Sequence, residues 1–316
     1  GYTYDAATDK WAISDAAADY VFIGQTPLDF NLPGTLSIVA SPAVCALANN
    51  TEKYHPIIDT ASYITLEAKH PQLNFVQIDC YSDLSPIADE LLLQIAKDPS
   101  VVLCLSSQDN NAMQAVRRMA IQLMQLDIRQ PIILVTDSQW KTTDEHLIHF
   151  AIETGALLLE GIGDGICLGL SKAAYESSVH GSNVSGRNYF NNSSIEQLLN
   201  TTAFGILQAT RTRISKTEYI SCPSCGRTLF ELQETTAKIR AVTNHLKGLK
   251  IAIMGCIVNG PGEMADADFG YVGSGVGKIT LYKCKEVMKR NIDSNVAVDE
   301  LILLLKEHNA WIEPSK

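Results

Sequence analysis

Short apolar runs rich in β-branched residues alternate with longer amphipathic segments over residues 20–160. Alternation of strands and helices at this spacing predicts a parallel sheet covered by helices. A closed eight-stranded barrel needs roughly 250 residues, so about six strands predict an α/β fold that is a partial TIM-barrel-like domain or an open parallel sheet. The expected strands are Tyr20–Ile23, Thr35–Ala40, Asn74–Ile78, Val101–Leu105, Pro131–Thr136 and Ala156–Leu159, and the expected helices are Pro86–Ala96, Asn111–Leu126 and Thr143–Thr154.

The pattern changes after residue 170. Ser, Asn and Gly become frequent and apolar residues sparse, which predicts a linker or long surface loop over about residues 171–194, followed by a helix over Ile195–Arg213. The remaining residues predict a small α/β sandwich, so we expect two domains, residues 1–213 and residues 214–316. The second domain has expected strands at Lys216–Ile220 and Lys250–Met254, and expected helices at Leu229–Leu246 and Val296–Glu307.

Charge and hydropathy exclude two classes of function. The 316 residues carry a formal net charge of -10 and no Lys/Arg-rich run, which argues against nucleic-acid binding. No apolar stretch approaches the roughly 18 residues that a membrane-spanning helix needs. The sequence begins with Gly1 instead of Met and has no charged or apolar leader, so we expect the natural chain to begin upstream, where any targeting peptide would lie.

The eight cysteines divide into two groups. Cys80 and Cys104 lie in or beside apolar strand-like runs and are expected to be small core residues. Cys222-Pro223-Ser224-Cys225-Gly226, by contrast, is a CxxC turn that brings two sulfurs to one centre. Such a turn alone is compatible with zinc, with a redox dithiol or with an iron–sulfur site.

A second motif, Gly255–Glu263, adds Cys256, and thirty residues separate Cys256 from Cys225. Its Asn-Gly-Pro-Gly run predicts a tight turn that folds Glu263 back toward Cys256. No second CxxC is present, and His245, the one histidine nearby, is expected on a helix face, so a structural zinc site is disfavoured. Three thiolates and one exchangeable oxygen ligand favour a catalytic [4Fe–4S] cluster. Cys284 is a weaker fourth-thiolate candidate, because it is expected at an exposed strand end.

At this point a family resemblance becomes clear. Thr217–Phe230 and Ile253–Gly270 resemble, at full length and in order, two motifs of the 4-hydroxy-3-methylbut-2-enyl diphosphate synthases of the methylerythritol phosphate route to isoprenoids. The strong resemblance covers about residues 214–316. Residues 1–213 are similar, more weakly, to the extra barrel-like domain of the long form of plants and chlamydiae, with Ala156–Gly165 as the best anchor. The N-terminal catalytic barrel is expected to be missing from this chain, because residues 1–213 hold only scattered basic residues for a diphosphate.

The resemblance implies a function and a set of roles. A cyclic methylerythritol diphosphate would be opened and reduced by two electrons from ferredoxin or flavodoxin. The resemblance implies cluster ligation by Cys222, Cys225, Cys256 and Glu263, with Glu263 as the labile ligand. Asn259 lies close enough in the same turn to help position substrate, and a plain turn role is the alternative. It also implies a location in the bacterial cytoplasm, or in the plastid stroma for a plant-type source. Lys278, Lys283 and Lys285 are candidates for steering an acidic donor. Two alternatives stay open: an iron–sulfur electron-transfer module and a zinc-stabilised interaction module.

Overall fold

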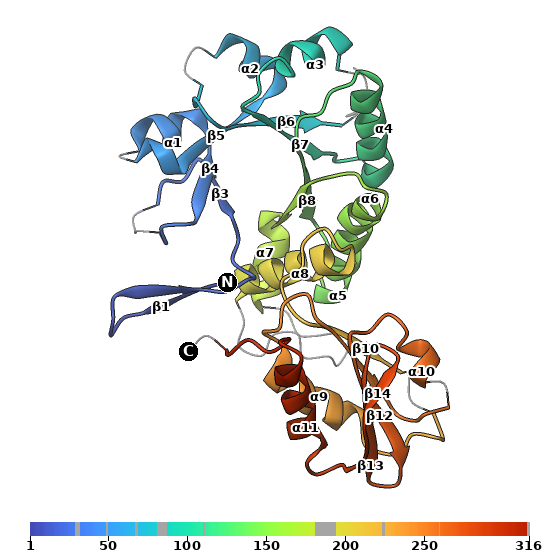
Figure 1. The fold of residues 1–316 in the computed structure, drawn as a ribbon. Helices are drawn as coiled ribbons and strands as arrows, with labels where there is room; N and C mark the ends of the chain where they lie inside the picture. The colour runs from blue at the N-terminus through green and yellow to red at the C-terminus, as the bar shows by residue number, and fades with distance from the viewer. Residues whose placement is uncertain are drawn as a thin grey trace. The chain divides into compact units, whose positions relative to one another are not determined.

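The computed structural model describes residues 1–28, 32–48, 50–66, 69–80, 87–109, 111–180, 194–222, 225–258 and 260–314. The chain divides into two units, Gly1–Arg213 and Ile214–Lys316, coloured blue to yellow and orange to red in Figure 1. Each unit has its own sheet and its own apolar core.

The first unit is built on a seven-stranded sheet in which every neighbouring pair is parallel. The strand order follows the sequence, and the sheet curves like part of a barrel with its ends at β3 and β9 (Figure 1). The predicted α/β fold, a partial barrel or open parallel sheet, is confirmed. The strands are β3 (Tyr20–Gly24), β4 (Ser37–Ala40), β5 (Tyr54–Asp59), β6 (Asn74–Asp79), β7 (Val101–Ser106), β8 (Ile132–Ser138) and β9 (Gly165–Leu170).

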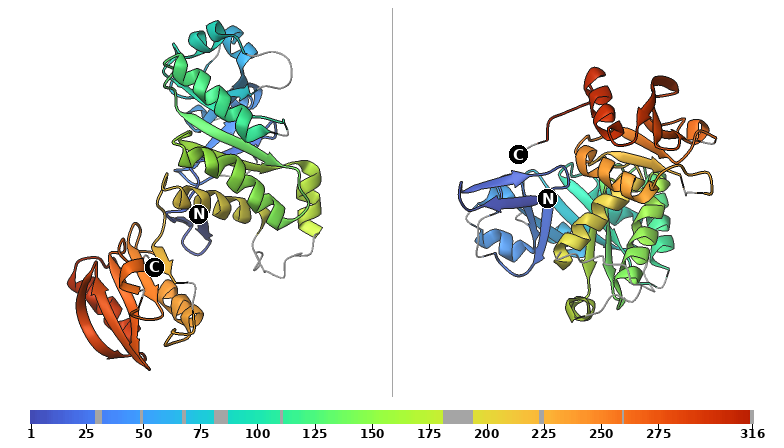
Figure 2. Two further views of the ribbon diagram at one scale, coloured as in Figure 1. Left: turned by 90° about the vertical axis from the view of Figure 1, so that its right-hand side faces the viewer. Right: turned by 90° about the horizontal axis from the view of Figure 1, so that it is seen from below.

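Helices lie along the outer face of this curved sheet (Figure 1 and Figure 2). The main core lies between these helices and the sheet, where Ile78 and Leu105 of the strands join Met119 and Leu123 of α4 in one buried cluster. Burial of such side chains is the main favourable term in folding. The helical elements are α1 (Pro42–Leu47), η1 (Thr51–Lys53), α2 (Thr60–Thr65), α3 (Asp89–Ile95), α4 (Ala112–Gln125), α5 (Thr143–Phe150), η2 (Ala151–Gly155) and α6 (Ala156–Leu159).

One predicted strand is wrong. Ala156–Leu159 is helix α6, which continues α5 through the π-helical turn η2. Alanine and leucine are strong helix formers, and a short apolar run does not distinguish a buried strand from a buried helical turn. The last strand of the sheet is instead β9, which was not predicted because its glycines weaken the strand pattern. The strand β5 was also missed, because Pro56 and His55 interrupt its apolar pattern.

The predicted linker over residues 171–194 is wrong in its first part. Lys172–His180 forms helix α7, and the Tyr175 hydroxyl donates a hydrogen bond to Glu196 Oε1 at 2.8 Å on the next helix, α8 (Ile195–Ala209). Ala174 of α7 is buried, which fixes the inward side of this helix. Residues 181–193 of the predicted linker, and Ser85 and Pro86 at the start of another predicted helix, lie outside the described residues.

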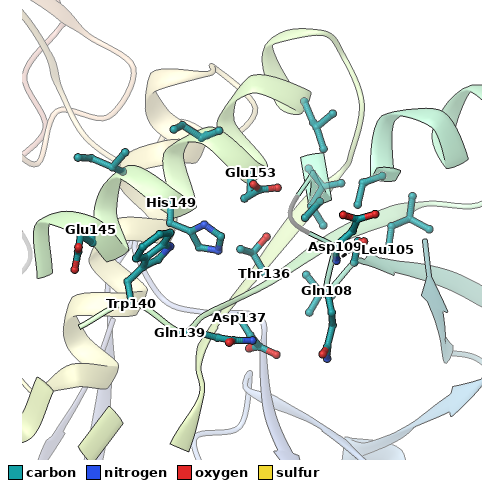
Figure 3. Close-up of a pocket in the computed structure, with 18 residues that line it drawn as sticks. Leu105, Gln108, Asp109, Thr136, Asp137, Gln139, Trp140, Glu145, His149 and Glu153 are labelled. Carbon is teal, nitrogen blue, oxygen red and sulfur yellow. Dashed lines mark hydrogen bonds between the residues drawn. The ribbon is translucent and has the colours of Figure 1, made fainter. Parts of the chain in front are cut away.

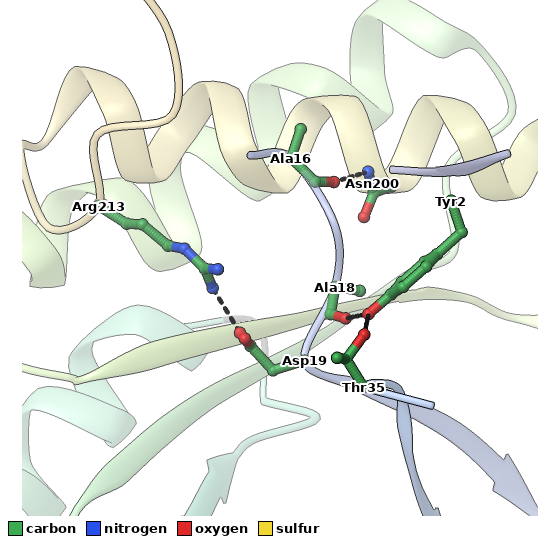
Figure 4. Close-up of polar contacts among 7 residues, drawn as sticks. All are labelled: Tyr2, Ala16, Ala18, Asp19, Thr35, Asn200 and Arg213. Atoms are coloured by element: carbon green, nitrogen blue, oxygen red, sulfur yellow. Dashed lines mark hydrogen bonds and ion pairs between the residues drawn. The ribbon is translucent and has the colours of Figure 1, made fainter. Parts of the chain in front are cut away.

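The first unit begins with a hairpin, β1 (Tyr2–Asp5) and β2 (Lys10–Ile13), and polar contacts link the hairpin and the residues after it to the rest of this unit (Figure 4). The Tyr2 hydroxyl donates to the carbonyl of Ala18 at 2.8 Å. Asn200 Nδ2 donates to the carbonyl of Ala16 at 2.9 Å, and Arg213 pairs with Asp19. These contacts join the start of the unit to α8 and to the residue that ends the unit.

The second unit contains a five-stranded sheet in the order β10-β11-β12-β13-β14. β10, β11 and β12 are parallel, whereas β13 and β14 run antiparallel to their neighbours. The helices α9 (Leu232–Thr243) and α11 (Ala297–Glu307) contribute to one buried cluster, and Met264 belongs to another. The strands are β10 (Glu218–Ser221), β11 (Lys250–Met254), β12 (Phe269–Gly275), β13 (Lys278–Lys283) and β14 (Glu286–Asp293).

The predicted strand over Lys250–Met254 is confirmed with both ends correct, and the expected strand near Lys216–Ile220 is confirmed as β10. The predicted helices of this unit appear as α9 and α11. The strands β12 and β14 were not predicted, and of β13 only the end near Cys284 was expected. Among the described residues, no helix has the length and apolarity needed to cross a membrane.

Candidate functional site

Two cysteine motifs of the second unit follow neighbouring parallel strands. β10 pairs with β11, with Ser221 opposite Ile253, so both strands end at the same edge of the sheet. Cys222 comes directly after β10, and Cys256 comes two residues after β11. β12 also ends here, because it runs parallel to β11. We call the carboxyl ends of β10, β11 and β12 the cysteine edge.

Hydrogen bonds hold the loops of this edge together. The backbone N–H of Gly255 donates to Cys222 Sγ at 3.4 Å, and the N–H of Leu229 donates to the carbonyl of Gly255 at 3.0 Å. Within the first loop, the Cys225 N–H donates to Thr228 Oγ1 at 3.1 Å, and the Thr228 N–H donates to the Cys225 carbonyl at 3.0 Å. Gly255, the residue before Cys256, is therefore hydrogen-bonded through its N–H to Cys222 and through its carbonyl to Leu229.

Glycines allow these segments to approach so closely. A Cβ on Gly255 would lie 2.8 Å from Thr228 Cγ2, and one on Gly273 of β12 would lie 2.5 Å from the Gly255 carbonyl oxygen. A Cβ on Gly260 would lie 2.9 Å from Met254 Cβ. These separations are shorter than real Cβ contacts, so the constraint at all three positions is space.

Glu263 ends a short helix: Gly260–Glu263 forms α10, a single helical turn, within the run for which a tight turn was predicted. Glu263 and Cys225 are exposed, whereas Cys222 and Cys256 are partly buried. Asn259 lies outside the described residues. Among the residues that the structure describes, no three Cys, His, Asp or Glu side chains are gathered closely enough to hold a single metal ion.

Cys284 is at the opposite edge of this sheet. It follows β13, and its N–H donates at 2.7 Å to the carbonyl of Asp268, the residue before β12 begins. The Asp268 N–H in turn donates to the carbonyl of Lys250, where β11 begins. A strand rises about 3.3 Å per residue, so the length of β11 separates Cys284 from Cys256. Cys284 is exposed, as predicted for a strand end, and cannot join the other cysteines as a ligand in this fold.

The buried cysteines of the first unit have a different environment. Burial raises the pKa of Cys80 to about 12 and that of Cys104 to about 12, and it raises the pKa of Cys167 to about 11. A thiol with such a pKa stays protonated at neutral pH, and the protonated form is a poor metal ligand. The expectation that Cys80 and Cys104 are core residues is confirmed.

A cavity of about 620 Å³ in the first unit was not predicted from the sequence (Figure 3). It lies at the carboxyl ends of β7 and β8, and its lining also comes from α4, α5 and η2. The described lining contains four carboxylates and no Lys or Arg. A diphosphate needs clustered basic donors, so this cavity does not suit one.

The fold and the cysteine edge together define an α/β protein whose smaller, second unit presents thiols at the ends of parallel strands. Residues 218–307 match the family described as the GcpE protein C-terminal domain. The chain is 40% identical, over 93% of its length, to a 4-hydroxy-3-methylbut-2-en-1-yl diphosphate synthase (flavodoxin) of Parabacteroides distasonis, of which it covers 43%. This chain is therefore related to the 4-hydroxy-3-methylbut-2-enyl diphosphate synthases, and the resemblance seen in its motifs is confirmed.

Two further relatives carry closely similar names. A synthase (flavodoxin) of Leptospira interrogans is 49% identical over 58% of this chain, and this chain covers 25% of that protein. A chloroplastic synthase (ferredoxin) of Arabidopsis thaliana is 50% identical over 54% of this chain, and this chain covers 20% of that protein. The chain thus spans less than half the length of these relatives.

Proposed function

We propose that the second unit holds a [4Fe–4S] cluster through Cys222, Cys225 and Cys256, with Glu263 as the exchangeable fourth ligand. This cluster would serve the reductive ring opening of 2-C-methyl-D-erythritol 2,4-cyclodiphosphate to 4-hydroxy-3-methylbut-2-enyl diphosphate. The observation that carries the proposal is the meeting of two cysteine-bearing loops at one sheet edge, joined by the Gly255–Cys222 hydrogen bond.

The donor set fits a cluster better than a single ion. Thiolates surround a [4Fe–4S] cluster at its corners, so their sulfurs need not converge on one point. Side chains too widely spaced to hold one ion are thus compatible with cluster ligation. Two of the three proposed thiols are only partly buried and the third is exposed, so all are accessible for assembly.

When bound, the cluster would supply single electrons and a Lewis-acidic iron for the substrate oxygen. The residues of the chain have separate tasks. The N–H of Gly255 donates to Cys222 Sγ and stabilises negative charge on that sulfur. Glu263 lies exposed on the single turn of α10, so its carboxylate can approach the edge or withdraw to admit substrate. For Asn259 we propose a role in positioning the substrate, based on its motif.

We propose flavodoxin or ferredoxin as the electron donor, as the relatives' names indicate for those proteins. The structure separates the three lysines suggested for docking. Lys278 begins β13 at the cysteine edge, because it pairs with Gly275 at the end of β12. Lys283 and Lys285 flank Cys284 at the opposite edge. Of these three lysines, we therefore propose Lys278 as the one that guides an acidic donor to the cysteines.

We also propose that basic residues for the diphosphate come from outside residues 1–316. The described lining of the large cavity in the first unit is acidic, and burial raises the pKa of Asp137 and of Glu153 in it. The 316-residue chain, loaded with cluster and supplied with reductant, should therefore not turn over the cyclic diphosphate. Substantial turnover by this chain would show that the first unit contributes a diphosphate site.

The experiment that tests the proposal is metal and sulfide analysis after strictly anaerobic purification. We expect about four irons and about four sulfides per chain, with broad visible absorption. Stoichiometric zinc without sulfide would contradict the proposal and favour a zinc-stabilised interaction module. An electron-transfer module would show the cluster but no change in its spectrum when the cyclic diphosphate is added to the longer, complete protein.

A further inference from the structure

The cavity of the first unit has the size and position of a small-molecule site. Its volume of about 620 Å³ lies within the range of ligand pockets, about 300–1,000 Å³. It opens at the carboxyl ends of β7 and β8, the side of parallel α/β sheets on which ligands usually bind. This position is independent of the cysteine edge, which belongs to the other unit.

One side of the cavity is apolar and well packed. Leu105, Leu134 and Leu157 are almost fully buried members of the main core, so they close the inner side of the cavity and present little surface to a ligand. Toward the opening, Trp140 and Ile148 also line the cavity, yet 52% and 60% of their surfaces are exposed. A large aromatic side chain left exposed at the rim of a cavity is typical of a surface that a ligand covers.

Polar groups gather in the middle of the lining, where Figure 3 shows Glu153, His149 and Thr136 close together. Glu153 comes from the π-helical turn η2, an irregularity that is frequent at functional sites. Burial raises the pKa of Glu153, while His149 and a backbone hydrogen bond from Met113 lower it in part. A partly buried carboxylate is disfavoured in its charged form unless a cation compensates it.

The charge of the lining indicates which class of ligand the cavity can bind. The carboxylates of Asp109, Asp137, Glu145 and Glu153 line the cavity, and the described lining includes neither Lys nor Arg. Anions are therefore disfavoured. A bare metal ion is also disfavoured, because no three candidate ligands gather within the described residues. The apolar walls and the volume instead suit an organic molecule that carries one positive charge.

We propose that this cavity binds a small primary amine, whose ammonium group pairs with Glu153 and whose apolar body packs against Trp140 and Ile148. The ammonium supplies the counter-ion that the lining lacks, in a charge-assisted hydrogen bond. The aromatic ring of Trp140 adds a favourable surface for a cation or an apolar group. This binding function is separate from the proposed cluster chemistry.

The test is calorimetric titration of the 316-residue chain with three monoamines: phenethylamine, hexylamine and benzylamine. We expect saturable binding of at least one of them. The neutral isostere of phenethylamine, 2-phenylethanol, and the anion 3-phenylpropionate should bind at least about tenfold more weakly, a difference of about 1.4 kcal/mol. Equal binding of the alcohol and the amine would overturn the proposal, as would the failure of all three amines.

Variants test whether the amine binds in this cavity. Glu153→Gln should weaken amine binding about tenfold or more, whereas Glu90→Gln, at an exposed position of helix α3 outside the lining, should leave binding unchanged. Cys256→Ser should bind the amine normally, which separates this result from the fate of the cluster. If Glu153→Gln binds as tightly as the unchanged chain, the proposal is wrong. If that variant fails to fold, the comparison of amine and alcohol on the unchanged chain decides.

Discussion

The two units use cysteine in opposite ways, although both place it on parallel strands. Cys104 and Cys167 lie within β7 and β9 of the first unit, where burial raises the pKa of each thiol and keeps it protonated. Cys222 and Cys256 of the second unit lie just beyond the ends of β10 and β11. A position beyond a strand end does not by itself leave a thiol available, because Cys80 directly follows β6 and is fully buried. Cys222 and Cys256 remain available because the loops around them leave both thiols only partly buried.

The two units also differ at the sheet edges formed by the carboxyl ends of their parallel strands. In the first unit, the carboxyl ends of β7 and β8 open into a cavity with an acidic lining. In the second unit, the loops that follow β10 and β11 pack closely against one another and against β12, because Gly255 and Gly273 have no side chain. Equivalent sheet edges thus support different chemistry, because the residues after each strand differ.

Four predictions test this contrast, and the largest effect comes first.

The largest effect is expected from Cys256→Ser, which removes a thiolate that anchors the cluster. Iron and sulfide after anaerobic purification should fall from about four of each per chain to near background. Cys284→Ser is the matched control, because Cys284 is an exposed cysteine of the same unit at the opposite edge. If both variants lose iron equally, the edge of the sheet at which a cysteine lies does not decide its role.

The second prediction concerns Glu263, measured in the complete, longer protein. Glu263→Ala leaves three thiolates in place, so much of the cluster should still assemble, while turnover falls by orders of magnitude. Each factor of ten corresponds to about 1.4 kcal/mol of lost transition-state stabilisation. Glu263→Cys should raise cluster stability yet also block turnover, because a fourth thiolate does not exchange readily for substrate.

Cluster content and turnover, measured side by side, distinguish the possible roles of Glu263. Near-normal turnover of Glu263→Ala would exclude the role of exchangeable ligand. Loss of the cluster as complete as in Cys256→Ser would instead make Glu263 a structural anchor. The exposed position of Glu263 on α10 makes a simple folding defect an unexpected cause.

The third prediction tests the close packing at the cysteine edge. Gly273→Ala would place a Cβ 2.5 Å from the Gly255 carbonyl oxygen, and backbone atoms cannot move aside cheaply. We expect the second unit to lose about 1–3 kcal/mol of stability, seen as a lower midpoint of thermal or denaturant unfolding. Gly275→Ala, in the same strand, meets Lys278 Cβ at an ordinary 3.6 Å and should have a smaller effect. Equal effects would show that close packing is not the constraint.

Much of this contrast could be predicted from the sequence, because it depends on local features. β-branched runs predicted β6, β7 and β11, and the cysteine motifs after β10 and β11 predicted the cysteine edge. Local pattern failed where tertiary packing decides. Phe269–Gly275 contains three glycines, which disfavour a strand in isolation, yet it becomes the central strand β12 because its glycines fit against neighbouring loops.

The cavity was beyond prediction for a different reason. Its lining residues extend from Leu105 to Leu157 and belong to two strands and several helical segments, so no short stretch of sequence carries its pattern. Glu153 and His149 have helical spacing, but a pair of this kind usually marks a solvated helix face. Only the closure of α4 and η2 over the ends of β7 and β8 makes them neighbours of Asp109 and Thr136.

The smallest effect is expected from removing one positive charge near the cysteine edge. Lys278 lies at this edge and pairs with Asp293 at 3.7 Å, while Lys285 lies exposed at the opposite edge. Long-range attraction to an acidic donor depends on distance and is screened by salt. Lys278→Gln should therefore slow reduction of the cluster by flavodoxin roughly twofold to fivefold at low ionic strength. The difference should vanish at high salt, and Lys285→Gln should change little under either condition. Stopped-flow reduction kinetics of the two variants provide the measurement. An equal decrease in both would mean that the donor responds to the overall charge of the unit, and that the cysteine edge has no electrostatic advantage over the edge that carries Cys284.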